Sequence, residues 1–216
     1  MTEKLLSAIG SAYPLTEVST GNYAKMKVSG MNFRINAYRA EGLGWVSVMT
    51  ASGFLGLMKM DTLIVNPMEL DMPLLSYDRV NAMGNDTLIY ELYDTFTAPA
   101  ELTATAKATQ EGDSLPDHDL GSHWYDSIKL AESLSKKGKK PQTPAFDALT
   151  EHYIAAFLSD CKNAAPCDGA AKREKASVYV EGLLTHGGPS TDVFKKALGQ
   201  EKTADLFRRV LFGTAG

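Results

Sequence analysis

Residues 61–80 read Asp61-Thr-Leu-Ile-Val-Asn-Pro-Met-Glu69-Leu-Asp71-Met-Pro73-Leu-Leu-Ser-Tyr-Asp78-Arg79-Val80. The run 62–65 predicts a strand buried on both faces, because it lacks the apolar and polar alternation of a strand with one wet face. Turn-forming residues at 66–67 and 71–73 signal the end of that strand and the start of a second one. The segment therefore predicts an antiparallel hairpin whose centre lies near Glu69 and Leu70.

Around this hairpin, residues 22–96 form short runs rich in Val, Ile, Tyr, Thr and Met that are separated by glycine-containing turns. This pattern predicts a meander of antiparallel strands. Residues 2–13 have apolar side chains at helical spacing, and the pattern turns helical again from about residue 100. The clearest later helices are expected at 145–162, 172–184 and 203–212.

A helix, an antiparallel sheet and further helices in this order predict an α/β fold in which helices cover both faces of the sheet. We expect a three-layer α/β/α sandwich with a central, mainly antiparallel sheet. The length of 216 residues and the 44% hydrophobic content suffice for one core, so we expect a single domain over residues 1–216.

The charge balance restricts the partners. The chain has 22 Lys and Arg against 26 Asp and Glu, a formal net charge of -4, which argues against nucleic acid as the main partner. The first six residues lack the basic and apolar regions of a secretory signal, and no apolar run is long enough for a membrane span. We therefore expect a cytoplasmic protein without a membrane partner.

The sequence lacks the motifs of common cofactor sites. It contains no CxxC pair, phosphate-binding loop or G-x-G-x-x-G, so we expect no built-in metal, nucleotide or iron–sulfur cofactor. Cys161 and Cys167 could form a disulfide, contribute half of a metal site, or remain thiols. The reducing environment of the cytosol favours the thiols.

Two aspartates of the hairpin form the candidate catalytic site. In a symmetric pair about residues 69–70, Asp61 lies opposite Asp78, with the Cβ atoms roughly 4.5–5.5 Å apart. Burial of both carboxylates would raise the pKa of one of them, making it a proton donor near neutral pH. Alternatively, both side chains face water. A register shifted by one residue would place them on opposite faces of the sheet.

The pattern Glu69-x-Asp71-x-Pro73-x-x-x-x-Asp78 resembles the central hairpin of the ferredoxin-dependent bilin reductases. The helix at 145–165 and the C-terminal segments 193–199 and 204–212 are also similar to that family. Red chlorophyll catabolite reductase is a more distant relative. The resemblance implies that Asp78 protonates an open-chain tetrapyrrole. Single electrons would come from ferredoxin or flavodoxin, without a bound flavin, nicotinamide or metal.

The chain departs from the family pattern at two places. Asp61 stands where the phycocyanobilin-forming members carry a catalytic histidine, which implies a different proton route. Where several members carry a second acidic residue, this chain has Gly188, so we expect the nearby His186 and Asp192 to bind the substrate.

A basic run is the candidate docking site for the acidic electron donor. It comprises Lys136, Lys137, Lys139 and Lys140. The alternative interpretation of this run is a solvated loop.

Two other functions remain open. One is a non-catalytic protein that binds a tetrapyrrole or another flat apolar ligand in a cleft between the sheet and the C-terminal helices. The other is an unrelated hydrolytic enzyme, although Ser76 has no identifiable histidine partner.

Overall fold

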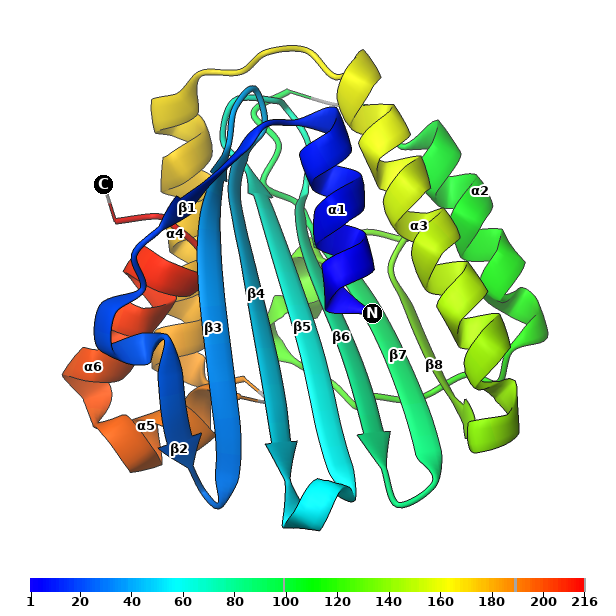
Figure 1. The fold of residues 1–216 in the computed structure, drawn as a ribbon. Coiled ribbons are helices and arrows are strands. Elements are labelled where there is room, and N and C mark those ends of the chain that lie inside the picture. The colour runs from blue at the N-terminus through cyan, green and yellow to red at the C-terminus, as the bar shows by residue number, and fades with distance from the viewer. Residues whose placement is uncertain (99, 189, 216) are drawn as a thin grey trace.

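The computed structural model describes residues 1–98, 100–188 and 190–215, and its centre is an eight-stranded antiparallel sheet (Figure 1). The strands are β1 (Leu15–Val18), β2 (Lys25–Val28), β3 (Met31–Ala40), β4 (Gly44–Gly53), β5 (Met58–Pro67), β6 (Leu74–Ala82), β7 (Asn85–Tyr93) and β8 (Leu134–Lys139). Their order is β1-β3-β4-β5-β6-β7-β8, and β2 also pairs with β3. Strands β3 to β7 therefore form the predicted meander.

Helices cover both faces of the sheet (Figure 1). They are α1 (Thr2–Ala12), α2 (Thr103–Glu111), α3 (Thr143–Asn163), α4 (Gly169–His186), α5 (Thr191–Leu198) and α6 (Gln200–Asp205), which continues into a π-helical segment, Leu206–Leu211. Helices α1–α3 lie on one face and α4–α6 on the other, so the three-layer sandwich is confirmed. Within the described residues, none of these helices is both long and apolar enough to span a membrane.

The central strand β5 is buried on both sides, as predicted. Leu63 and Val65 pack in the core beneath α1 and α3, whereas Ile64 packs in the core beneath α4 and the C-terminal segment. Aromatic contacts join the first core across the layers, because the ring of Tyr90 in β7 stacks on Tyr153 of α3 at 4.0 Å. Two separate apolar cores therefore hold the sheet between its helical layers.

Three elements escape the sequence prediction: β1, α5 and β8. Strand β8 contains most of the basic run at 136–140, which the sequence suggests is a loop. It is the edge strand beside β7, and lysine-rich edge strands are common because the charges oppose pairing with other chains. Such a strand lacks the apolar alternation by which strands are found in a sequence.

The two cysteines are both free thiols, in agreement with the prediction. Cys161 is buried in α3, and burial raises the pKa of its thiol well above the usual range. Cys167 is partly buried and follows the turn after α3.

Candidate functional site

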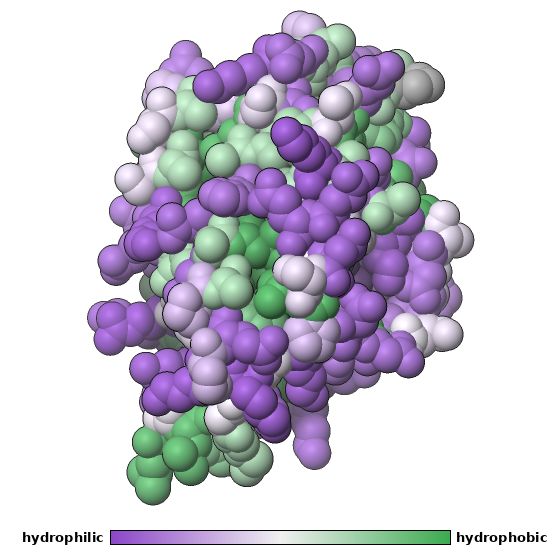
Figure 2. All heavy atoms as spheres, turned by 90° about the vertical axis from the view of Figure 1, so that its right-hand side faces the viewer, coloured by the Kyte–Doolittle hydropathy of each residue, from purple (hydrophilic) through white to green (hydrophobic). Residues whose placement is uncertain are grey.

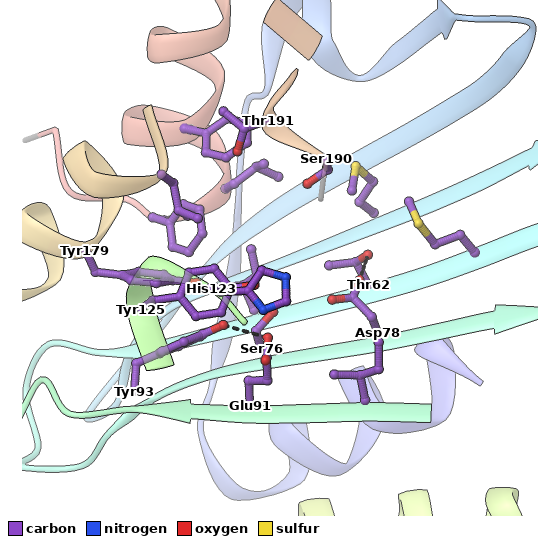
Figure 3. Close-up of a pocket in the computed structure, with 18 of the residues that line it drawn as sticks. Thr62, Ser76, Asp78, Glu91, Tyr93, His123, Tyr125, Tyr179, Ser190 and Thr191 are labelled. Atoms are coloured by element: carbon purple, nitrogen blue, oxygen red, sulfur yellow. Dashed lines mark hydrogen bonds between the residues drawn. The ribbon is translucent and has the colours of Figure 1, made fainter. Parts of the chain in front are cut away.

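A cavity of about 270 Å³ lies between the sheet and the C-terminal helices (Figure 3). Strands β4–β7 line one side, and α4, the start of α5 and residues 207–212 line the other. Residues 120–125 close a further side. The lining is mostly apolar and aromatic, with a few polar groups, which is typical of small-molecule sites of roughly 300–1,000 Å³. The structure thus contains the cleft expected from the sequence.

Asp78 of β6 projects into this cavity (Figure 3). Thr62 of β5 is its cross-strand neighbour and donates a hydrogen bond from Oγ1 to Asp78 Oδ1 at 2.5 Å. Burial raises the pKa of the Asp78 carboxyl to about 6, and the carboxylate of Glu91 adds to this effect, whereas the Thr62 hydrogen bond opposes it. Asp78 can therefore hold a proton close to neutral pH and release it within the cavity.

The prediction that Asp61 faces Asp78 is wrong. Asp61 pairs with Arg79, and Asp78 pairs with Thr62, so the hairpin is centred on Leu70 rather than between residues 69 and 70. Because side chains alternate along a strand, this shift turns Asp61 to the opposite face of the sheet, away from the cavity.

Contacts distant in sequence fix this register. The turn between β5 and β6 pairs with the segment after α3 through a bridge between Leu70 and Pro166. The Asp71 amide donates to the carbonyl of Ala165, and the Cys167 amide donates to the carbonyl of Glu69. The conformation of residues 68–73, which connect β5 to β6, therefore depends on contacts with residues 165–167 and not on its own sequence alone.

Glu91 of β7 is a second carboxylate in the cavity and was missed in the sequence. Its cross-strand partner is Ser76, which makes it a diagonal neighbour of Asp78 on the same face. Tyr93 Oη donates to Glu91 Oε2 at 2.6 Å, and Lys129 Nζ lies 3.7 Å from Oε1. No described residue forms a hydrogen bond with Oε1. An acidic residue within the apolar run 88–93 is the signal that could have identified it.

Aromatic side chains surround the polar groups of the cavity (Figure 3). The ring of His123 stacks on Tyr125 with centroids 4.9 Å apart and 6° between the planes. His123 Nδ1 is buried and has no hydrogen-bond partner among residues 1–98, 100–188 and 190–215. Tyr179 of α4 packs against Tyr93 at 4.2 Å, and burial raises the pKa of both hydroxyls well above their usual range. These tyrosines therefore stay protonated and can act as hydrogen-bond donors.

Two predicted substrate-binding residues, His186 and Asp192, lie outside this cavity. His186 is the exposed last residue of α4, and Asp192 is exposed in the first turn of α5. The chain turns at Gly187, where φ is 85°, and this turn directs the side chains of Ser190 and Thr191 toward the cavity instead. His186 and Asp192 therefore do not line this cavity, and their binding of a substrate stays a prediction.

The basic run is divided between the two sides of β8. Lys136 is buried and forms an ion pair with Asp117 at 2.6 Å, so it is not part of an open docking surface. Lys137, Lys139 and Lys140 are exposed. The alternation of side chains along the strand separates Lys136 from the others, which the interpretation as a loop did not anticipate.

The fold has a solved counterpart. Phytochromobilin synthase from tomato, determined in complex with biliverdin, superposes with a TM-score of 0.80. The chain has the fold of phytochromobilin synthase. The match covers 98% of this chain and 81% of the tomato enzyme at 12% sequence identity. No family model and no curated protein matches the sequence. The predicted α/β architecture with a mainly antiparallel sheet is thus confirmed.

Proposed function

We propose that the protein reduces a linear tetrapyrrole in the cavity between the sheet and the C-terminal helices. The observation that carries the proposal is the partly buried carboxyl of Asp78, whose pKa of about 6 suits it to donate a proton there. The tomato enzyme of the same fold was solved with biliverdin, and the central hairpin resembles that of the bilin reductases.

The proposed reaction needs an external one-electron donor. Reduction of one tetrapyrrole double bond consumes two electrons and two protons. We assign the electrons to reduced ferredoxin or flavodoxin, which becomes oxidised, and at least one proton to Asp78. Solvent would return that proton to the carboxylate after each turnover. Glu91 would hold negative charge beside Asp78 and thereby keep its pKa raised.

The polar atoms of the cavity fit a ligand with N–H groups on a flat apolar frame. Within the part of the chain that the structure describes, neither Oε1 of the Glu91 carboxylate nor Nδ1 of His123 has a hydrogen bond. Buried polar atoms are usually satisfied, so both are suited to accept hydrogen bonds from a ligand. Tyr125 and Tyr179 contribute flat aromatic surface to the cavity lining. A pyrrole ring supplies both features.

The electron donor would approach on the exposed lysines of the β8 end, Lys137, Lys139 and Lys140. Positive charge there would raise the association rate with an acidic protein, and salt would lower it. Lys136 would not take part because Asp117 already pairs with it.

A spectroscopic titration tests the proposal. The protein is titrated anaerobically with biliverdin, and reduced ferredoxin with its reductase is then added to wild type and to Asp78→Asn. We expect binding by both, a change of the visible spectrum on turnover by wild type, and a stalled radical or no turnover by the variant. Absence of biliverdin binding by wild type would refute the proposal.

A non-catalytic binder of a tetrapyrrole or another flat apolar ligand is the second candidate. The separation of Asp61 from Asp78 favours it, because the predicted pair of proton donors does not form. A binder needs no proton donor in its cavity. Binding of biliverdin by wild type without any reduction by ferredoxin would support this candidate and exclude the reductase.

A further inference from the structure

Exposed apolar side chains gather at one end of the sheet. Phe54, Leu55 and Leu57 in the turn between β4 and β5 are 63%, 105% and 65% exposed, and Met83 between β6 and β7 is 85% exposed. The Met83 amide donates to the Leu57 carbonyl at 3.3 Å, so the two turns are adjacent. Figure 2 shows an apolar projection at the lower end of the molecule, where Figure 1 places the β4–β5 turn. We call these four side chains the apolar tip.

Three residues of the apolar tip have strained backbone conformations. Phe54, Leu55 and Met83 have φ values of 52°, 57° and 50°, in the left-handed region that favours glycine. Large apolar residues are disfavoured there both by sterics and by contact with water. Backbone strain of this kind persists mainly at functional positions, so the tip is a candidate contact surface.

Lysines are the charged side chains of the turns beside the apolar tip, and the acidic residues nearest to these turns along the strands, Asp61 and Asp86, lie within β5 and β7. The segments at this end of the sheet, 27–32, 52–59, 81–85 and 138–142, contain Lys27, Lys59, Lys139 and Lys140 and no acidic residue, although the whole chain has a net charge of -4. The Lys140 amide donates to the carbonyl of Gly84, which joins the lysines of β8 to the same end. An apolar tip with a basic rim complements a surface that is both apolar and anionic.

We propose that the apolar tip and its lysine rim bind the surface of an anionic phospholipid bilayer. Apolar side chains on a protrusion can enter the boundary between headgroups and acyl chains, while the lysines contact the anionic headgroups. A protein partner is the weaker match, because the four side chains form a small protrusion, whereas stable interfaces use about 20 residues on each side. Such peripheral binding needs no spanning helix. It does not rest on the proposed reductase activity, but it would use Lys139 and Lys140, which the proposed electron donor would also contact.

Co-sedimentation with lipid vesicles tests this proposal. The full chain is mixed at low salt with vesicles of phosphatidylcholine alone, or with vesicles that also contain phosphatidylglycerol. The tip variant carries Phe54→Ser and Leu55→Ser, and the rim variant carries Lys27→Gln and Lys59→Gln, which leaves the lysines of β8 intact. The controls are Val178→Ser, which changes an exposed apolar side chain of α4 outside the tip, and Lys107→Gln, which changes an exposed lysine of α2.

We expect wild type and both controls to bind only the anionic vesicles. The tip variant should bind at least about tenfold more weakly because two inserted side chains are lost. The rim variant should bind about 30-fold more weakly, since each lysine near an anionic surface contributes about fivefold.

Several results would overturn the proposal. One is failure of wild type to sediment with anionic vesicles, and another is unchanged binding by the tip variant. A third is a tip variant that alters only self-association, or only the rate of ferredoxin-dependent turnover, because the tip would then contact a second copy or the electron donor. Biliverdin binding measured in parallel separates this outcome from failure of the proposed function.

Discussion

Replacement of Asp78 by Asn should stabilise the protein at alkaline pH although it removes the proposed proton donor. The native carboxyl has a pKa of about 6, above its ordinary value of 3.8. Between these values the native state keeps a proton that the unfolded chain has released, so the free energy of unfolding of wild type falls as the pH rises. The gap of about two pH units corresponds to at most about 3 kcal/mol.

The Asn variant lacks this loss because its amide does not ionise. Its side-chain oxygen can still accept the hydrogen bond from Thr62. Relative to wild type, we expect the variant to gain about 1–3 kcal/mol in unfolding free energy between about pH 4 and pH 8. Urea denaturation at both pH values measures this gain.

Asp61→Asn is the matched control, since it removes one carboxylate from the opposite face of the same hairpin. A change that both variants share would come from the loss of a carboxylate from the hairpin and not from the cavity. Equal destabilisation of Asp78→Asn at both pH values, or an equal gain in both variants, would refute the inference that Asp78 is held in its protonated form by the cavity.

Three further perturbations test other parts of the structure. Glu91→Gln should lower the pKa of Asp78, because it removes a neighbouring negative charge, and should shift the alkaline limb of a pH–rate profile, where the proton donor ionises, to lower pH. Arg79→Met should lower the unfolding free energy, measured by urea denaturation, by about 3–5 kcal/mol, because the buried carboxylate of Asp86 loses its ion-pair partner. A Cβ added at Gly182 of α4 would overlap the ring of Trp124, so Gly182→Ala should displace this ring and lower stability by about 1–3 kcal/mol. Because Trp124 lies between the cavity residues His123 and Tyr125, the change should also weaken biliverdin binding. Unchanged profiles, denaturation curves or affinities would contradict the respective arguments.

The strands and helices of the centre could be predicted because their signals are local. The meander at 22–96 is marked by short runs of strand-favouring residues between glycine turns, and the helix at 145–162 by apolar side chains at helical spacing. Strand β8 could not be found in this way, because an edge strand of lysines and glycine buries few apolar side chains and depends on pairing with β7.

The candidate site was only partly predictable. Asp78 was found because a local motif precedes it, and the structure places it in the cavity. Glu91 and His123 join it from β7 and from the connection between α2 and β8, and no sequence spacing relates them to the hairpin. His186 and Asp192 lie outside the cavity, whereas Ser190 and Thr191 of the same segment line it, and the turn at Gly187 is not specified by any spacing in the sequence.

The sequence by itself determined the class of fold, the two-sided burial of the sheet and the aspartate that enters the cavity. These features follow from residue periodicity and from local turn chemistry. Only the tertiary structure decided the partner of that aspartate. Contacts between the hairpin turn and residues 165–167 shift the register by one position, and one position is enough to exchange the two faces of a strand.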